Sequence, residues 1–209
     1  MEFKKAMVVG AGAMGAGIAQ LFAQSGIPVT LTDRSEEIAS DAVAGLEKRM
    51  ARRVEQGKMS DADKNGIIGR ITAGTGHAAA SGADIVVEAI FEDMEVKKQT
   101  LTALDKAAPD RTIFASNTTS LSISEMAAAT SRPDKVVGMH FFNPPVVMKL
   151  VEIMPGIGTA PETVDAVSEL ARTLGKQPVQ ARFDSPAGIG SRVLAGSLNE
   201  AVEVFAQGL

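Results

Sequence analysis

Short apolar segments alternate with amphipathic segments along most of the chain. Apolar runs bounded by turn residues are typical of buried strands, whereas apolar positions with a helical repeat predict helices. The expected strands are residues 6–9, 28–32, 71–72, 84–88, 112–116, 136–142, 147–154 and 178–181. The expected helices are residues 13–25, 35–55, a shorter one from Ser60, 95–106, 122–128 and 161–174. This alternation predicts an α/β fold with a doubly wound, mostly parallel sheet.

The strands expected at 136–142 and 147–154 flank a proline-containing turn and would pair antiparallel, which adds an antiparallel edge to the sheet. A turn centred near residue 146 places His140 opposite Glu152, with Cβ atoms roughly 4.5–5.5 Å apart. A carboxylate that fixes the tautomer of a histidine makes that histidine a general base suited to neutral pH. The alternative is a structural ion pair, because a carboxylate inside a strand is costly without a partner.

A glycine-rich loop joins the first expected strand to the first expected helix. Its sequence, Gly10-Ala11-Gly12-Ala13-Met14-Gly15, matches the G-x-G-x-x-G pattern of dinucleotide-binding loops. The first glycine makes a tight turn, the second lets a pyrophosphate approach, and the third lets the helix pack on the strand. The alternative is a tight turn without a ligand.

Asp33 ends the second expected strand, where a dinucleotide-binding domain places its ribose-binding carboxylate. A carboxylate there accepts hydrogen bonds from the adenosine ribose and repels a 2′-phosphate, which favours NAD over NADP. Arg34 leaves some tolerance for NADP open. We therefore expect a Rossmann-like domain that binds NAD. Its expected cofactor contacts in this region are Gly10, Gly12, Ala13, Met14, Gly15 and Asp33.

Composition narrows the class of protein. The 209 residues include 21 Lys and Arg and 25 Asp and Glu, a net charge of −4, with no basic face that suggests nucleic-acid binding. Cysteine is absent, which excludes thiolate metal sites and a cysteine nucleophile and fits a reducing compartment. No signal peptide is visible, and no apolar run approaches the ~20 residues that span a bilayer. We expect a cytoplasmic protein with no membrane segment and no metal site.

The pattern changes from Pro186 onward. Residues 187–209 are predicted to form a glycine-interrupted, mostly apolar helix that no strand follows. Because little else is left for this helix to pack against, we expect residues 1–184 to form the NAD-binding domain. Residues 185–209 would begin a helical substrate and dimerisation domain that this chain leaves incomplete. An exposed apolar helix also predicts self-association, so a homo-oligomer is expected.

Ser116-Asn117-Thr118-Thr119-Ser120 follows another expected strand. In open α/β sheets the ligand crevice lies at the carboxyl edge of the strands, so these polar side chains are candidates for the site. Such a run is also typical of an N-cap cluster for the next helix. The residues alone do not separate the two interpretations.

Several segments together resemble the L-3-hydroxyacyl-CoA dehydrogenase family, including its short-chain 3-hydroxybutyryl-CoA members. The resemblance covers essentially the whole chain. Relatives of the gulonate type share the glycine loop, but Phe-Phe-Asn-Pro after His140 favours the acyl-CoA branch. The segments that carry the resemblance are VVGAGAMGAGIAQLFAQSG from Val8, DIVVEAIFEDMEVKKQTL from Asp84, FASNTTSLSISE from Phe114, VVGMHFFNPPVVMKLVEIMPG from Val136, LGKQPV from Leu174 and DSPAGIGSR from Asp184.

The resemblance implies roles for individual residues. His140 would be the general base that removes the 3-hydroxyl proton of the substrate, and Glu152 would orient it. Glu92 and Lys97 match positions that contact the nicotinamide ribose side of the cofactor. Cofactor contacts are also expected from Asn117 and Asn143.

Two departures from the family pattern bear on the site. Thr119 stands where the family usually has serine, so the hydroxyl is kept and a methyl is added. Ser191 stands where the family has a catalytic-site asparagine, and the shorter side chain would reach the substrate carbonyl only through a shift or a water. Both are still expected in the catalytic site. Ala187-Gly188 replaces the usual Gly-Phe, which alters the entry to the second domain.

The long helix expected at 35–55 carries basic residues near its end. The resemblance implies that this helical arm binds the coenzyme A nucleotide, whose phosphates need cations. The alternative is an ordinary solvated face, because acidic residues are interleaved with the basic ones. The expected contacts with coenzyme A are Arg49, Arg53 and Lys58.

The implied activity is the reversible, NAD-dependent oxidation of a short-chain L-3-hydroxyacyl-CoA to the 3-ketoacyl-CoA. An acyl-CoA is thus the expected partner, and a dimer is the assembly that the resemblance implies. Two alternatives stay open. The chain could bind NAD without turnover, or it could oxidise a hydroxy acid that carries no coenzyme A. His77, the second histidine, has no paired acid in the sequence and is assigned no role.

Overall fold

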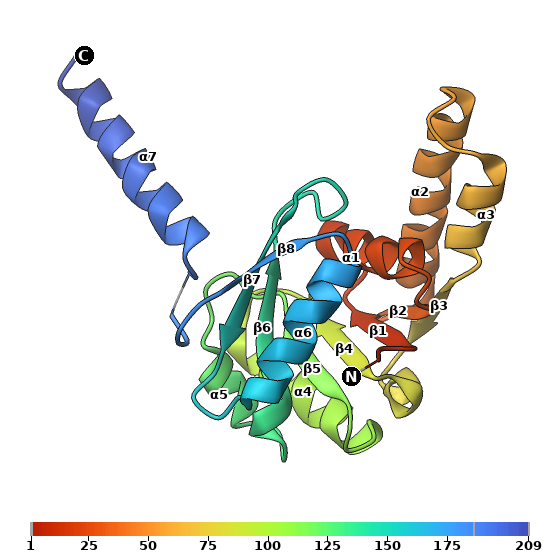
Figure 1. The fold of residues 1–209 in the computed structure, drawn as a ribbon, viewed down its shortest axis with the longest axis horizontal. Helices are drawn as coiled ribbons and strands as arrows, with labels where there is room; N and C mark the ends of the chain where they lie inside the picture. The colour runs from red at the N-terminus through yellow and green to blue at the C-terminus, as the bar shows by residue number, and fades with distance from the viewer. Residues whose placement is uncertain (1, 186, 209) are drawn as a thin grey trace.

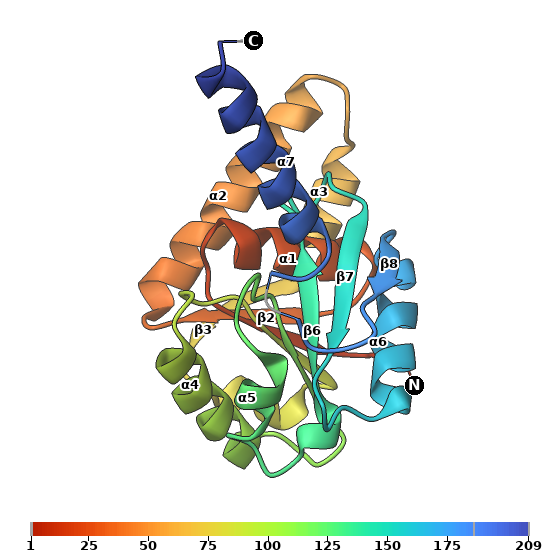
Figure 2. The same ribbon diagram turned by 90° about the vertical axis from the view of Figure 1, so that its left-hand side faces the viewer.

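The computed structural model describes residues 2–185 and 187–208, which form one sheet with helices on both faces (Figures 1 and 2). The strand order is β3-β2-β1-β4-β5-β6-β7-β8. Neighbouring strands run parallel except β6 and β7, so the predicted doubly wound sheet with an antiparallel edge is confirmed. The strands are β1 (Ala6–Val9), β2 (Val29–Asp33), β3 (Ile71–Thr75), β4 (Ile85–Glu88), β5 (Ile113–Ser116), β6 (Val136–Phe141), β7 (Leu150–Pro155) and β8 (Gln177–Gln180).

Helices cover the sheet in two groups. Apolar side chains of α1, α2, α3 and α6 belong to one core cluster, and those of α4 and α5 belong to the other. Figure 2 shows α4 and α5 on the opposite side of β6 from α6. The helices are α1 (Ala13–Gln24), α2 (Glu36–Glu55), α3 (Asp61–Ile68), α4 (Met94–Ala107), α5 (Ile123–Ala127), α6 (Pro161–Thr173) and α7 (Gly190–Ala206), with short 3₁₀ helices η1 (Ala78–Gly82) and η2 (Pro133–Lys135).

The central strands are apolar at consecutive positions because both faces of the sheet are buried. In β1, Ala6 and Val8 belong to one core cluster, whereas Met7 and Val9 belong to the other. Side-chain caps fix where the helices begin. Ser35 caps α2 by accepting a hydrogen bond from the N–H of Ile38, as its sequence position predicts.

The turn between β6 and β7 is longer than predicted. β7 begins at Leu150 rather than at residue 147, because the preceding residues form a separate turn that contains a cis Asn143–Pro144 peptide bond. The buried ammonium group of Lys176 donates to the carbonyl oxygens of Pro145 and Met148. These bonds hold the turn against the start of β8 and keep residues 147–149 out of the strand.

α7 extends away from the body of the molecule (Figure 1), and none of its residues is buried. It begins at Gly190 rather than at residue 187. The reason is that Ala187 and Gly188 have φ angles of 64° and 53°, in the left-handed region that ends a right-handed helix. Pro186, where the change of sequence pattern was predicted to begin, is outside the described residues. Among the described helices, none is long and apolar enough to cross a membrane.

Candidate active site

The predicted contact between His140 and Glu152 is present. The two residues are direct partners in the antiparallel register of β6 and β7. The Nδ1 atom of His140 lies 2.8 Å from Oε2 of Glu152. The side chains are 7% and 1% exposed, so little water competes for this contact. The geometry therefore provides a buried imidazole with a fixed carboxylate partner.

The second oxygen of Glu152 binds the beginning of α7. Its Oε1 atom accepts hydrogen bonds from the backbone N–H groups of Ile189, at 2.9 Å, and Gly190, at 2.6 Å. Gly188 packs so closely that a Cβ there would lie 2.6 Å from Oε2 of Glu152. Gly188, which stands where the family has phenylalanine, thus lets the backbone approach the carboxylate, and the carboxylate has three polar partners, His140, Ile189 and Gly190.

The second ring nitrogen of His140, Nε2, points to Thr119. The Nε2 atom of His140 lies 3.2 Å from Oγ1 of Thr119, and the ring of Phe142 packs at a tilt with its centroid 4.7 Å away. Because a carboxylate accepts only, the Nδ1 atom of His140 carries the proton in this pair. The lone pair of Nε2 is then free to accept a proton from a hydroxyl group on the Thr119 side.

The glycine loop lines a hollow of about 790 Å³ between β1, β2 and β4. Gly10 has a φ angle of 102°, and a Cβ there would lie 2.5 Å from the carbonyl oxygen of Ala89. A Cβ on Gly15 would lie 1.7 Å from the carbonyl oxygen of Gly10, whereas a Cβ on Gly12 would meet nothing within 4 Å. Gly10 and Gly15 are therefore required by the loop itself, and the space beside Gly12 is left for a ligand. Ala13 and Met14 begin α1, whose first-turn N–H groups have no partner inside the helix.

Asp33 lies at the end of β2 and lines the same hollow. Its Oδ2 atom accepts the N–H of Ala11 and its Oδ1 atom accepts the N–H of Arg34, each at 2.7 Å. Each carboxylate oxygen has a second lone pair, so ribose hydroxyls can still bind there. Asp33 thus fixes the loop and presents its charge to the hollow.

Two further residues of this hollow were missed by sequence reasoning. His77, which was assigned no role, lines it together with Phe91. Both follow strands, β3 and β4, whose carboxyl ends lie at the edge where ligands bind in open sheets. That position was the available signal.

Glu92 and Lys97 belong to one charged network with a third residue, Glu88. Lys97 is 1% exposed, and its Nζ atom lies 2.6 Å from Oε1 of Glu88 and 3.3 Å from Oε2 of Glu92. Neither Glu92 nor Lys97 is among the residues that line the glycine-loop hollow, and their contacts with the cofactor stay predictions. Burial raises the pKa of Glu92, but hydrogen bonds from Thr118 and the loop and the charge of Lys97 more than offset this, so its pKa lies below the ordinary value.

The remaining predicted residues have different surroundings. Asn117 accepts the N–H of Phe141 at its Oδ1 atom, at 2.9 Å, and so joins the end of β5 to β6. Asn143 is exposed beside the cis peptide bond. Ser191 follows Gly190 in the first turn of α7, close in sequence to the N–H groups that bind Glu152. Their predicted roles stay predictions.

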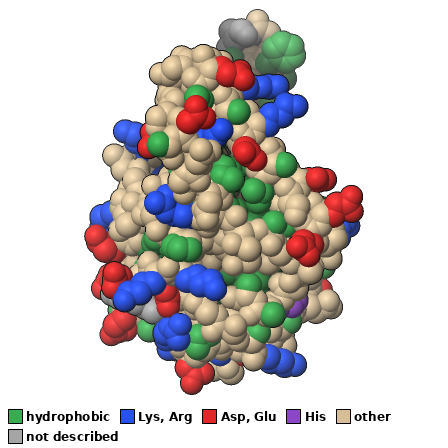
Figure 3. All heavy atoms as spheres, turned by 90° about the vertical axis from the view of Figure 1, so that its right-hand side faces the viewer, with side chains coloured by type: hydrophobic (Ala, Val, Ile, Leu, Met, Phe, Trp, Pro, Cys, Tyr) green, Lys and Arg blue, Asp and Glu red, His purple; other side chains and the backbone are tan. Residues whose placement is uncertain are grey.

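Arg49, Arg53 and Lys58 are exposed on the arm formed by α2 and α3, which projects beyond the sheet (Figure 1). Figure 3 shows that basic and acidic side chains are interleaved on this face of the molecule. Lys58 donates to the side chain of Gln56 at 3.0 Å. The structure does not bring these three residues into contact with His140, and their role in binding coenzyme A stays a prediction.

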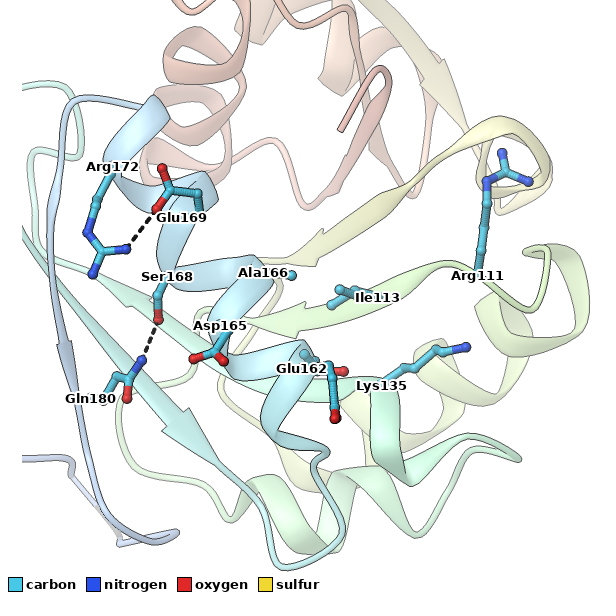
Figure 4. A pocket seen from close by; sticks show the side chains of 11 residues that line it. Arg111, Ile113, Lys135, Glu162, Asp165, Ala166, Ser168, Glu169, Arg172 and Gln180 are labelled. Carbon is cyan, nitrogen blue, oxygen red and sulfur yellow. Dashed lines mark hydrogen bonds and ion pairs between the residues drawn. The ribbon is translucent and has the colours of Figure 1, made fainter. Parts of the chain in front are cut away.

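A second hollow, of about 650 Å³, lies beside α6 and contains none of the predicted site residues (Figure 4). Its charged side chains are of both signs and partly pair with each other. Arg172 contacts Glu169 at 2.9 Å, and Gln180 donates to Ser168 at 2.9 Å. Part of its polar lining is thus paired within the protein.

A model of the family "3-hydroxyacyl-CoA dehydrogenase, NAD binding domain" matches residues 5–184. The chain belongs to the 3-hydroxyacyl-CoA dehydrogenase family. Membership in this family confirms the predicted resemblance, the NAD cofactor and the class of NAD-dependent oxidoreductase.

Named relatives agree with this family. The chain is 44% identical over 209 residues to a probable 3-hydroxybutyryl-CoA dehydrogenase of Bacillus subtilis, covering 100% of this chain and 72% of the relative. It is 40% identical to the mitochondrial hydroxyacyl-coenzyme A dehydrogenase of Sus scrofa, covering 98% and 67%. Among solved structures, the (S)-3-hydroxybutyryl-CoA dehydrogenase of Ralstonia eutropha superposes with a TM-score of 0.95 at 38% identity, covering 99% and 73%.

Proposed function

We propose that this family member catalyses the reversible, NAD-dependent oxidation of a short-chain L-3-hydroxyacyl-CoA to the 3-ketoacyl-CoA, with His140 as the general base. The observation that carries the proposal is the buried pair of His140 and Glu152, whose Nδ1 and Oε2 atoms lie 2.8 Å apart. The same chain has a glycine loop that lines a hollow suited to a dinucleotide. The relatives named 3-hydroxybutyryl-CoA dehydrogenases support the short acyl chain.

The residues around the glycine loop fit NAD. The hollow is open beside Gly12, where a pyrophosphate can approach the backbone. The N–H groups of Ala13 and Met14 at the start of α1 can bind the pyrophosphate, and the carboxylate of Asp33 can bind the adenosine ribose. Gly10 and Gly15 would shape the loop. Glu92, Lys97, Asn117 and Asn143 would complete the nicotinamide side. When bound, NAD supplies the acceptor for the hydride.

His140 would take the proton of the substrate hydroxyl at its Nε2 atom. Since Nδ1 faces Glu152, the imidazolium that forms is stabilised by the carboxylate, and the ring cannot turn away. In the reverse direction the same nitrogen returns the proton to the carbonyl oxygen. Thr119, 3.2 Å from Nε2, is placed to hydrogen-bond that oxygen, and Ser191 is the second candidate for this contact.

The coenzyme A part of the substrate is proposed to bind at Arg49, Arg53 and Lys58, because its phosphates require cations and these side chains are exposed on one arm. Replacing Arg49 and Arg53 by Gln should raise the KM for acetoacetyl-CoA and leave NADH affinity unchanged. An unchanged KM would assign these residues to the solvated surface.

We also infer two functional units, an NAD-binding unit in residues 1–184 and a helical unit for substrate binding and dimerisation from residue 185 on. Exposed apolar side chains along α7, including Leu194, Leu198 and Val202, support a homo-oligomer. Sedimentation velocity should detect a dimer that Leu198→Glu weakens. A monomer at high concentration would contradict this.

A cytoplasmic location is proposed because acyl-CoA esters and NAD are intracellular metabolites, and cell fractionation checks it.

The central experiment follows the loss of NADH with acetoacetyl-CoA in the wild-type protein and in His140→Gln. General acid–base catalysis contributes about 10²–10⁴-fold, so the variant should lose about that much of its rate. Its affinity for NADH, read from the fluorescence of the bound nucleotide, should stay close to that of the wild type. His77→Gln removes the other histidine and is the matched comparison: because His77 lines the cofactor hollow and does not contact His140, its substitution should change the affinity for NADH and not kcat.

The outcomes separate the alternatives. Equal loss of rate and NADH binding in His140→Gln would refute its role as the base. NADH binding without turnover in the wild type would favour a nucleotide-binding protein, and turnover of free hydroxy acids only would favour a substrate without coenzyme A.

A further inference from the structure

We propose that Glu88 is a positioning residue of the active site, which acts through Lys97 and Glu92 on the loop that presents Thr119 to His140. The proposal deepens the proposed function and rests on it for its kinetic readout. It assigns a task to a residue that touches neither of the predicted ligands.

Glu88 is completely buried at the carboxyl end of β4, the central strand next to β1. Its carboxylate has three donors from three different segments. Oε1 accepts from the Nζ atom of Lys97 at 2.6 Å and from the N–H of Ile90 at 2.8 Å, and Oε2 accepts from the hydroxyl of Ser116 at 2.6 Å. Glu88 thus ties α4, the segment after β4 and the end of β5 to one point.

Lys97 connects Glu88 to Glu92, because its ammonium group contacts both carboxylates. Its ammonium group lies 3.4 Å from the carbonyl oxygen of Ile90, in addition to its contacts with Glu88 and Glu92. Because Lys97 is 1% exposed, water cannot replace these partners. Its position is therefore set by Glu88, and the position of the Glu92 carboxylate is set by Lys97.

Glu92 in turn fixes the loop after β5. Its Oε1 atom accepts from the hydroxyl of Thr118 at 2.6 Å, from the N–H of Thr119 at 3.0 Å and from the N–H of Ser120 at 3.1 Å. The hydroxyl of Thr119 is the group that lies 3.2 Å from Nε2 of His140. Without a fixed Glu92, nothing in this chain of contacts holds Thr119 at that distance.

A purely structural role does not account for the buried charges. Replacing a buried ion pair by apolar residues of similar size is often neutral or stabilising, so the pair is weak evidence for stability. Its place matters, because it lies at the edge of the sheet where ligands bind. A second ion pair, between the partly buried Asp105 and Arg132 at 2.6 Å, lies at the other end of α4 and serves as the comparison.

The test uses nuclear magnetic resonance and kinetics on the full chain. Its two histidines give two imidazole signals, so His77 is an internal reference for His140. At one fixed pH without ligands, Glu88→Gln should displace the ring signals of His140 in the same direction as Thr119→Val does. Asp105→Asn should leave them in place, and the signals of His77 should stay unchanged in all three variants.

With NADH and acetoacetyl-CoA, Glu88→Gln should lower kcat by about 10- to 100-fold, the effect of a small misplacement at a reacting centre, with a much smaller change in NADH affinity. Asp105→Asn should keep kcat. If the wild type does not turn over this substrate, the proposed function fails while the resonance experiment still decides the positioning role.

A double variant guards against loss of folding. Glu88→Gln with Lys97→Met removes both fully buried charges, so no buried charge is left without a partner. The proposal predicts that the His140 signals stay displaced, because Glu92 has lost Lys97. Their full return to the wild-type positions, or unchanged signals in Glu88→Gln, would overturn it. Unchanged signals in Thr119→Val would overturn it as well, since the contact with His140 would then be absent.

Discussion

Ala187 adopts a left-handed backbone conformation with a φ angle of 64°, and it is the one residue other than glycine to do so in the described part of the chain. The left-handed conformation is unfavourable for a residue with a Cβ, by about 1–2 kcal/mol. The family usually has glycine here. The strain at Ala187 is therefore removable by a single substitution.

Ala187→Gly should stabilise the protein by about 0.5–1 kcal/mol, because relief of the strain exceeds the extra entropy that glycine gives the unfolded chain. Urea denaturation measures the change. Ala44→Gly, in the exposed middle of α2, is the matched control and should destabilise by about 0.5–1 kcal/mol. A loss of stability in both variants would show that Ala187 is not strained in solution.

Single residues differ in how well the sequence predicts them. His140 and Glu152 were predicted to meet because an antiparallel pair with a known turn fixes which residues oppose each other. Glu88 was not predicted, because a charge at the end of an apolar strand has no local partner in the sequence. Its partner, Lys97, lies one helical turn into α4 and meets it only after the strand and helix have packed.

At the scale of elements, hydrogen bonds join the start of α7 to the pair of His140 and Glu152. The first N–H groups of α7 bind Glu152, and Gly188 leaves room for that approach. A helix that otherwise buries nothing is thus fixed at one end by the residue that orients the proposed base. Displacing the start of α7 should therefore change the position of the Glu152 carboxylate and, with it, the orientation of the His140 ring.

Gly188→Ala tests this coupling. A Cβ at this position would lie 2.6 Å from Glu152, so the start of α7 must move away and the N–H groups of Ile189 and Gly190 should exchange with solvent faster. The rate with acetoacetyl-CoA should fall by about 10- to 100-fold. Hydrogen exchange and steady-state kinetics measure the two effects.

Gly196→Ala is the control within the same helix, because a Cβ there meets nothing within 4 Å. It should keep the rate and slow the exchange of α7, since alanine favours a helix over glycine by about 1 kcal/mol. Wild-type exchange and rate in Gly188→Ala would show that α7 and Glu152 are not coupled.

The type and order of the elements were predictable because the apolar pattern differs between buried strands and amphipathic helices. The residues at which the elements begin and end were less predictable. The late start of β7 depends on Lys176, whose side chain crosses from the beginning of β8 to bind the turn. A contact between segments that are distant in sequence leaves no trace in the local pattern.

At the scale of the whole molecule, hydrogen-bonded aspartates that are buried or partly buried hold separate regions together. Asp84 binds the N–H groups of Lys4 and Lys5, Asp105 binds Arg132, and Asp184 binds the start of α5. In each case burial raises the pKa of the carboxyl group, but hydrogen bonds from N–H and O–H donors outweigh that effect. All three pKa values lie below the ordinary value for aspartate.

These depressed pKa values predict loss of stability in acid. The unfolded chain takes up protons at about pH 3.9, whereas the folded carboxylates take them up only at lower pH. Their contribution is thus present in full above about pH 5 and is lost as the pH falls through the folded pKa values. The urea midpoint should fall steeply between about pH 5 and pH 2.

Asp105→Asn shows how much one of these groups contributes. The amide keeps the shape of the side chain but neither titrates nor neutralises Arg132, so the variant should be less stable than the wild type at neutral pH. The gap between the two proteins should narrow as the pH falls, because the wild-type carboxylate is itself protonated there. Urea denaturation of both proteins across the pH series measures the gap. A gap that stays constant down to about pH 2 would mean that the loss comes from packing alone and that the carboxylate charge of Asp105 contributes nothing to stability.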